Sequence, residues 1–126
     1  MTTELILVDD DKILLIVLEK MIRTVRKDLQ ISSFISGKQA LDYLSENPGS
    51  KESASILIDI NLRDMNAWEF IDKLETAKEA CPKIILMTSS VSSVNSERAK
   101  KHPAVTGFFE KPITFENVHQ IFQMLD

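Results

Sequence analysis

The strongest constraint in the sequence is an apolar run that ends on a single carboxylate. Ser55-Ile56-Leu57-Ile58 leads into Asp59, and apolar residues resume on either side of Asn61. A short run of this kind, rich in isoleucine, is typical of a strand that is buried on both faces. Because a buried charge is costly without a partner, we expect Asp59 to lie at the end of this strand and to meet a cationic group there.

Comparable apolar runs alternate with helical patterns along the chain. Besides the strand that ends at Asp59, the sequence predicts strands over Glu4–Val8, Leu29–Ile35, Lys83–Met87 and Thr106–Phe109. It predicts helices over Lys12–Lys27 and Asn95–Lys101, and three more that begin at Ser36, Asn66 and Thr114. Residue types that cap helix N-termini stand at Asp11, Ser36 and Asn66. Strands that alternate with helices in this way predict an α/β domain with a parallel, doubly wound sheet.

The first and last helices carry apolar stripes that should pack on this sheet. The first stripe is formed by Leu14, Leu18, Met21 and Val25, and the last by Phe115, Val118, Ile121, Phe122 and Leu125. The apolar run from Ile13 to Leu18 is more than one helix face needs. We expect a deeply buried first turn, and the alternative is a surface that binds a partner.

Composition excludes several classes of protein. With 126 residues and 44% apolar content, the chain suits one domain with a single core over residues 1–126. The net charge of −4 and the lack of a basic patch argue against direct binding of nucleic acid. The single cysteine, Cys81, excludes an internal disulfide framework and a cysteine-based zinc site. No apolar run reaches the roughly 20 residues of a membrane span, and none reads as a signal peptide, so we expect a soluble, cytoplasmic protein.

Reactive side chains follow four of the five predicted strands. These residues are Asp9 and Asp10, Asp59, Thr88 and Lys111. Ligands of a doubly wound sheet bind outside the carboxyl ends of the strands, and the strand order 2-1-3-4-5 would bring the three aspartates together. Carboxylates at such short range repel one another unless a hard cation holds them, and oxygen ligands favour magnesium.

A phosphoryl group fits this arrangement. A backbone carbonyl at Asn61 can complete the magnesium shell, and Mg²⁺ accepts a phosphate oxygen as a further ligand. Asp59 can then attack phosphorus and form an aspartyl phosphate, while Thr88 and Lys111 bind phosphoryl oxygens. Singly, each residue has a plainer interpretation: an acidic residue after a strand often caps the next helix, and an exposed lysine is often only solvated. Their shared position at strand ends favours a site.

This combination resembles the receiver domain of two-component response regulators, and the resemblance covers essentially the whole chain. It rests on Asp9-Asp10 after Leu-Val, Asp59-x-Asn61 after an apolar strand, Thr88-Ser89 and Lys111-Pro112. The resemblance implies a flavodoxin-like fold, with a five-stranded parallel sheet in the order 2-1-3-4-5 and five helices. It also implies that Asp59 is the phosphoacceptor of a phosphorelay, loaded by a sensor histidine kinase or a histidine phosphotransfer protein.

The same resemblance assigns roles to the residues around the acceptor. Asp10 would bind Mg²⁺ directly, Asp9 directly or through water, and Asn61 through its backbone carbonyl. Lys111 would contact the acidic cluster when the site is empty and the phosphoryl group when it is loaded. The peptide bond between Lys111 and Pro112 is often cis in this family.

A conformational switch is also implied, and it uses Thr88 and Phe108. Phosphorylation would draw the Thr88 hydroxyl inward, and the Phe108 ring would follow into the space beneath the helix at residues 95–101. The plainer interpretation of Phe108 is an ordinary core ring. The implied partner surface consists of that helix, the strand at residues 106–109 and the last helix, and it carries Phe108 and Val118.

Two positions depart from the family pattern. Many members have proline where this chain has Arg63, and glycine where it has Ala67. Proline fixes φ and glycine permits positive φ, so both changes alter the stiffness of the loop after Asp59. We expect them to affect magnesium affinity or phosphate lifetime rather than the acceptor chemistry.

We therefore expect a stand-alone receiver domain, a signalling protein that catalyses only its own phosphorylation and dephosphorylation. It would act on a downstream protein, as a monomer or as a dimer that forms on phosphorylation, without direct contact to nucleic acid or insertion into a membrane. The alternative is a non-catalytic, receiver-like interaction module with a structural cation, although a scaffold has no use for Asp59, Thr88 and Lys111 together. A phosphatase with an aspartyl nucleophile is disfavoured, because its second acid is replaced by Asn61.

Overall fold

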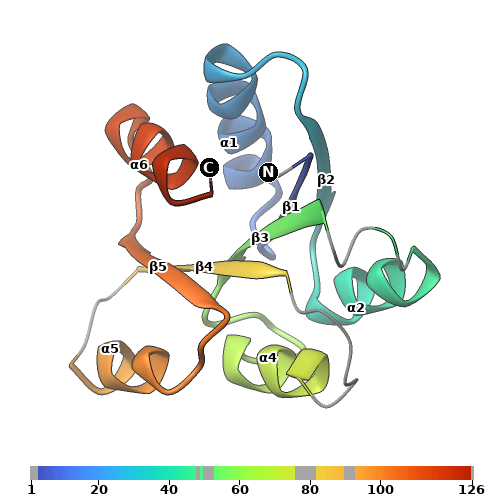
Figure 1. Cartoon of the computed structure of the whole chain (residues 1–126), viewed down its shortest axis with the longest axis vertical. Helices are drawn as coiled ribbons and strands as arrows, with labels where there is room; N and C mark the ends of the chain where they lie inside the picture. Colours follow the sequence, from blue (N-terminus) through green and yellow to red (C-terminus); the bar gives the residue numbers. More distant parts are fainter. Residues whose placement is uncertain (1–2, 48, 50–52, 76–81, 90–92, 126) are drawn as a thin grey trace.

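One parallel sheet of five strands forms the centre of the molecule (Figure 1). The computed structural model describes residues 3–47, 49, 53–75, 82–89 and 93–125. The strands are β1 (Glu4–Val8), β2 (Gln30–Phe34), β3 (Ala54–Asp59), β4 (Lys83–Thr88) and β5 (Val105–Glu110). They lie in the order β2-β1-β3-β4-β5, and every neighbouring pair is parallel. The predicted flavodoxin-like strand order is confirmed.

Helices cover both faces of the sheet (Figure 1). They are α1 (Lys12–Val25), α2 (Gly37–Glu46), α4 (Ala67–Glu75), α5 (Ser93–Lys100) and α6 (Phe115–Leu125). One hydrophobic core lies between the sheet and the pair α1 and α6, and a second lies between the sheet and α2, α4 and α5. The doubly wound α/β architecture predicted from the sequence is confirmed.

Alternate side chains of the central strands fill these two cores. In β3, Leu57 packs with α1 and α6, whereas Ile56 and Ile58 pack on the opposite face. Every residue of β1 and β3 is buried. Each buried leucine or isoleucine side chain contributes roughly 1.5–3 kcal/mol to folding. The uninterrupted apolar runs of the sequence therefore reflect strands that have no solvent-facing side.

The predicted N-caps form hydrogen bonds at the starts of three helices. The side chain of Asp11 accepts from two amides in the first turn of α1. The hydroxyl oxygen of Ser36 accepts from the amide of Gln39 at 3.1 Å. Asn66 and Glu69 each accept from the amide of the other, at 2.9 and 3.4 Å, as in a capping box. Each cap stabilises its helix by about 1 kcal/mol.

The apolar stripe predicted for α1 faces the core, but only Leu18 of its four residues is fully buried. The fully buried residues of α1 are Leu15, Leu18 and Ile22. Three members of the predicted stripe flank them and are only half-buried, namely Leu14, Met21 and Val25. Because the run at residues 13–18 is apolar at every position, its periodicity does not reveal which side faces the sheet.

The expectation of a deeply buried first turn is wrong for three residues of this run. Ile13, Ile16 and Val17 are 75%, 55% and 51% exposed. The sheet and α6 contact only one side of α1, so the remaining apolar side chains of the run face solvent. The alternative left open by the sequence, a surface available to a partner, agrees with this exposure.

The stripe predicted for α6 is right except at Phe115. The helix buries Val118, Ile121, Phe122 and Leu125, whereas Phe115 is 49% exposed. Ile113, just before the helix, packs into the same core and occupies the place expected for Phe115. Because Val118 is buried, its expected position on a partner surface is wrong as well.

Some sequence predictions lie outside the described residues. One is the single cysteine, Cys81, and others fall on two segments that the sequence leaves between predicted strands and helices, at residues 48, 50–52 and 90–92. Within the described parts of the chain, no helix has both the length and the apolar character needed to cross a membrane.

The corrected orientation of α1 can be tested with two identical substitutions. Ile22 is 1% exposed and Ile16 is 55% exposed. We expect Ile22→Ala to lower the free energy of unfolding by about 2–5 kcal/mol, because it leaves a cavity in the core. Ile16→Ala should change it by less than about 0.5 kcal/mol. Urea unfolding of both variants measures the difference, and equal losses would contradict the orientation.

Candidate functional site

Strand pairing brings the predicted acidic residues to one edge of the sheet. β1 and β3 are neighbours, and their register pairs Val8 with Ile58. Asp9 and Asp59, the next residue of each strand, therefore stand side by side. Both continue the alternation that directs side chains toward α1 and α6. Lys111 follows β5 at the same edge of the sheet.

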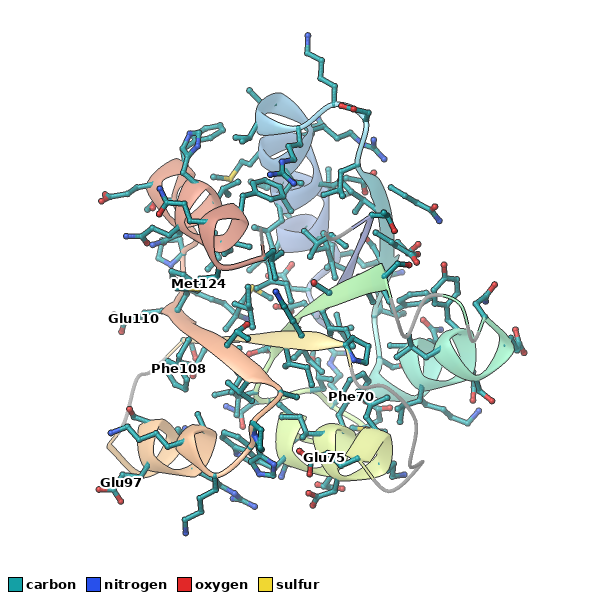
Figure 2. The ribbon with its side chains drawn as sticks, in the orientation of Figure 1. Phe70, Glu75, Glu97, Phe108, Glu110 and Met124 are labelled. Carbon is teal, nitrogen blue, oxygen red and sulfur yellow. The ribbon has the colours of Figure 1, made fainter. Side chains whose placement is uncertain are left out.

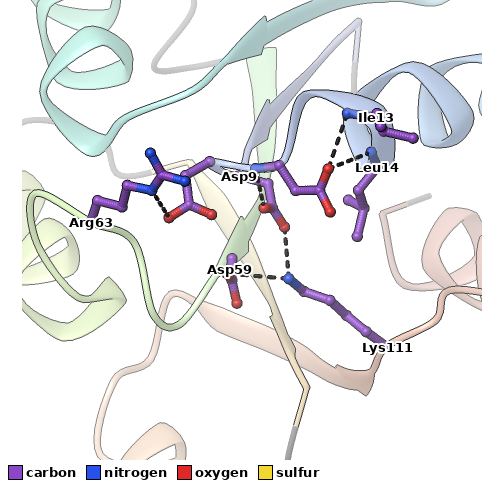
Figure 3. A network of polar contacts seen from close by, with 8 residues as sticks. Asp9, Ile13, Leu14, Asp59, Arg63 and Lys111 are labelled. Carbon is purple, nitrogen blue, oxygen red and sulfur yellow. Dashed lines mark hydrogen bonds and ion pairs between the residues drawn. The ribbon is translucent and has the colours of Figure 1, made fainter.

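Lys111 is the cationic partner expected for Asp59. Its Nζ lies 2.8 Å from Oδ2 of Asp9 and 3.2 Å from Oδ2 of Asp59 (Figure 3). The other oxygen of Asp9 accepts a hydrogen bond from the amide of Asp11 at 2.9 Å. Asp10 has a cation of its own nearby, because Nε of Arg63 lies 3.7 Å from its Oδ2.

The three carboxylates form a site that can hold a metal ion. Oxygens of Asp9, Asp10 and Asp59 lie within 4.8 Å of one another. Asp9 is completely buried, and its Oδ2 is held by the Lys111 ammonium at 2.8 Å. A carboxylate oxygen has two lone pairs, so this oxygen can also accept a metal ion. The all-oxygen ligand set suits a hard divalent ion.

The surroundings of Asp59 raise its pKa. Burial raises the pKa of Asp59, and the negative charge of Asp9 raises it further. The charge and hydrogen bond of Lys111 and the backbone N–H of Asn61 lower the pKa, but they do not compensate, so it lies above its ordinary value. A cation bound at this cluster would relieve the repulsion.

Lys111 is held in its charged form. Burial alone would lower the pKa of Lys111. The hydrogen bond to Asp9 and the charges of Asp59 and Asp9 outweigh burial and raise the pKa above its ordinary value. The ammonium is therefore present across the physiological pH range.

Thr88 and Phe108 lie toward the other face of the sheet. Thr88 ends β4 and is buried, and the residue two before it, Leu86, pairs with Phe108 of β5. Thr88 and Phe108 thus occupy diagonal positions on the same side of neighbouring strands. Figure 2 shows Phe108 on the side of β5 that faces α5. Its ring packs against the core beneath α5 and lines a pocket of about 220 Å³ together with Ala99 and Lys100.

The segment around Lys111 is tied to β4. The amide of Lys111 donates a hydrogen bond to the carbonyl of Thr88 at 2.8 Å. The peptide bond between Lys111 and Pro112 is cis, as expected. The backbone thus joins the lysine of one face to the threonine of the other.

Sequence reasoning missed one residue next to this site. Asp64, in the loop after β3, hydrogen-bonds two amides at the start of α2. The sequence gives no sign that Asp64 contacts Gly37 and Lys38, because helical and strand periodicities describe single elements and not contacts between two of them. Arg63 drew attention only as a replaced proline, and its approach to Asp10 was not expected.

A doubly wound sheet with an acidic cluster and a lysine at its carboxyl edge is the architecture of a CheY-like signalling domain. The family described as response regulator receiver domain matches residues 5–123 of the chain. The chain belongs to this family. Its members act in two-component signalling, in which phosphorylation and Mg²⁺ are general features, and they are not enzymes of the usual kind.

Individual relatives are distant in sequence and close in fold. The chain is 24% identical over 123 residues to hybrid signal transduction histidine kinase L of Dictyostelium discoideum, covering 95% of this chain and 7% of that protein. It is also 24% identical over 123 residues to chemotaxis protein CheV2 of Helicobacter pylori, covering 97% of this chain and 37% of that protein. The structure of a two-component response regulator from Cytophaga hutchinsonii is 25% identical with a TM-score of 0.86, and covers 99% of this chain and 98% of its own.

The raised pKa of Asp59 predicts a pH-dependent effect of its removal. The folded protein binds the Asp59 proton more tightly than the unfolded chain, whose pKa is near 3.8. Stability therefore falls as pH rises from that value through the folded pKa. In buffer free of divalent cations, we expect Asp59→Asn to be more stable than wild type at neutral pH, with a gain that shrinks as the pH is lowered.

Urea unfolding at a series of pH values measures this gain. Asp42→Asn is the control, because Asp42 is exposed and pairs with Lys38 on its own helix. It should change stability by less than about 1 kcal/mol at every pH. An Asp59→Asn variant that is less stable than wild type at neutral pH would contradict the electrostatic account.

Proposed function

We propose that Asp59 is the phosphoacceptor of this receiver domain and is loaded by a phosphohistidine of a kinase or phosphotransfer protein. The observation that carries the proposal is the contact of one ammonium, that of Lys111, with both Asp9 and Asp59. A carboxylate beside a fixed cation is suited to attack an anionic group, because the cation offsets the charge that the group brings.

The transfer exchanges one bond to phosphorus for another. A carboxylate oxygen of Asp59 attacks the phosphorus of phosphohistidine, the new P–O bond forms, and the P–N bond breaks. The imidazole nitrogen leaves with the bonding electron pair and is protonated by solvent. Lys111 then pairs with an oxygen of the transferred group. The signal ends by hydrolysis: water attacks the phosphorus, the P–O bond to Asp59 breaks, and inorganic phosphate is released. The domain thus catalyses both its own phosphorylation and its own dephosphorylation.

Mg²⁺ is the ion we propose for the acidic cluster. Bound there, it would neutralise charge and bind a phosphoryl oxygen. Asp10 would hold it directly, Asp9 directly or through water, and Asp59 and the Asn61 carbonyl would complete the protein ligands. The clustering of three carboxylates and the all-oxygen ligand set support this assignment.

The output is a change at Thr88 and Phe108. The hydroxyl of Thr88 would bind a phosphoryl oxygen, and the ring of Phe108 would move further into the core beneath α5. The pocket that Phe108 lines, and its position diagonal to Thr88, support this proposal. Phenylalanine has no hydroxyl that could form a hydrogen bond, so burial of the ring must stabilise the inward state.

Intact-mass measurement with acetyl phosphate tests the acceptor. We expect one phosphoryl adduct on the wild type in the presence of Mg²⁺, no adduct without Mg²⁺, and no adduct on Asp59→Asn. Asp42→Asn should be labelled like the wild type. A folded protein that binds Mg²⁺ but forms no adduct would favour the alternative, a receiver-like interaction module with a structural cation.

The exposed part of α1 suits contact with the phosphodonor protein. The donor must place its histidine over Asp59, so its surface has to cover the rim of the site. α1 begins at this rim with Asp11, and its exposed residues Ile13 and Val17 line an apolar pocket of about 240 Å³ beside Pro112. An apolar surface continuous with the acceptor site is the kind that a protein donor can bury.

This contact can be separated from the chemistry by changing the donor. We expect Ile13→Ser to slow loading from a histidine-phosphorylated protein by about tenfold, equivalent to roughly 1.4 kcal/mol. Loading from acetyl phosphate should be unchanged, because the small donor does not touch α1. Met124→Ser is the control, since Met124 is also exposed and apolar but lies at the end of α6. Equal slowing with both donors would contradict the docking role.

A further inference from the structure

The start of α2 is capped by a residue from a distant loop. A helix leaves its first amides without partners inside the helix. In α2, Ser36 accepts from Gln39, and the two preceding amides donate to Asp64. Gly37 N–H reaches Oδ1 of Asp64 at 3.1 Å, and Lys38 N–H reaches Oδ2 at 2.9 Å. Both carboxylate oxygens are therefore used.

This contact is favourable in charge as well as in geometry. A helix N-terminus carries partial positive charge, and hydrogen bonds to an ionised acceptor are stronger than neutral ones. Slight burial would raise the pKa of Asp64, but the amides of Lys38 and Gly37 hold it below its ordinary value. Asp64 therefore stays charged and bound to α2 at neutral pH.

The neighbouring residue of the loop packs onto the same place. A Cβ atom at Gly37 would lie 2.6 Å from Sδ and 2.7 Å from Cγ of Met65. A side chain at position 37 would therefore require Met65 to shift. Asp64 and Met65 thus attach the tip of the loop to the first turn of α2.

The base of the loop is closed by backbone hydrogen bonds. Ile60 N–H donates to the carbonyl of Met87 at 2.9 Å, and Ile60 accepts from the N–H of Ala67 at 2.8 Å. Asn61 and Asn66 form an antiparallel bridge. Between this base and the tip, residues 61–63 run past the acidic cluster, where Arg63 lies 3.7 Å from Asp10.

We propose that Asp64 is a positioning residue for cation binding, because it fixes the loop that presents the Asn61 carbonyl to the acidic cluster. The inference rests on the proposed function, in which that carbonyl is a ligand. A proline at the position of Arg63 would restrict the backbone of this loop locally. The contact of Asp64 with α2 restricts the loop through a neighbouring element.

The effect on affinity follows from ordering. Without the contact between Asp64 and α2, residues 62 and 63 gain conformational freedom, and the position of the Asn61 carbonyl depends on the pairing of Asn61 with Asn66. Cation binding must then restrict the loop, and this loss of conformational entropy opposes binding. Asp64 itself touches none of the proposed ligands, so its removal can weaken binding only through the position of the loop.

Calorimetric titration with Mg²⁺ tests this role. We expect Asp64→Ala to weaken the affinity by about tenfold, in line with other residues that orient metal ligands. Asp64→Asn should have an intermediate effect, because its side-chain oxygen accepts from one amide while its NH₂ group cannot accept from the other. Asp42→Ala, on the same helix α2, should bind Mg²⁺ like the wild type. Unchanged affinity in Asp64→Ala, with lower thermal stability, would overturn the proposal and leave Asp64 as a helix cap.

Two further variants keep the test decisive if Asp64→Ala folds poorly. Gly37→Ala forces Met65 away from α2 and should weaken Mg²⁺ binding while Asp64 is intact. Two double variants are then compared, Arg63→Pro with Asp64→Ala and Arg63→Ala with Asp64→Ala. The first should bind Mg²⁺ more tightly than the second, because proline restricts the backbone and alanine does not. Equal affinities of these two double variants would overturn the proposal.

The acceptor function is judged separately. At saturating Mg²⁺, acetyl phosphate should label Asp64→Ala as fully as the wild type. A wild type that binds no Mg²⁺ or accepts no phosphoryl group would refute the proposed function, whereas a labelled wild type with unchanged Mg²⁺ affinity in Asp64→Ala would refute only the positioning role.

Discussion

The arrangement of the carboxyl edge of the sheet depends on the ion pairs of the Lys111 ammonium with Asp9 and Asp59. The strand order places Asp9 and Asp59 side by side, because they follow Val8 and Ile58, which are paired in neighbouring parallel strands. Two buried carboxylates in that position destabilise the fold unless a cation lies between them. Removing Lys111 would leave both carboxylates without their cation, and the loss of the cation from a buried ion pair costs roughly 3–5 kcal/mol. The same lysine therefore stabilises the empty site and, in the proposed function, pairs with the phosphoryl group of the loaded one.

The residues of the proposed acceptor site and those of the proposed switch lie on opposite faces of the sheet. Asp9, Asp59 and Lys111 belong to the face covered by α1 and α6, whereas Thr88 and Phe108 belong to the face covered by α2, α4 and α5. The sheet would separate these groups if they lay at the middle of their strands. At the strand ends the separation disappears, and the hydrogen bond from the Lys111 amide to the Thr88 carbonyl joins the two faces. A change at the acceptor can therefore reach the core beneath α5 over a short path.

Sequence reasoning was most successful where the information is local. Buried strands, caps and the polar residues that follow strands are each readable within a few positions, and the strand order follows from the fold class. Sequence reasoning failed where one sequence pattern is compatible with several ways of packing a helix on the sheet. The first turn of α1 is apolar throughout, so the side that faces the sheet is undetermined, and Ile113 rather than Phe115 fills the core beside α6. Asp64 escaped notice because its partners lie in another element, and only the folded backbone brings them within reach.

The close approach of Met65 to Gly37 also has an evolutionary consequence. The two positions share one small volume, so a larger residue at 37 requires either a displaced Met65 or a shorter residue at 65. Receiver sequences that attach this loop to α2 should therefore change the two positions in concert, and those that stiffen the loop with proline should let them drift independently. Correlated substitution at these two sites would mark the lineages in which the attachment was inherited.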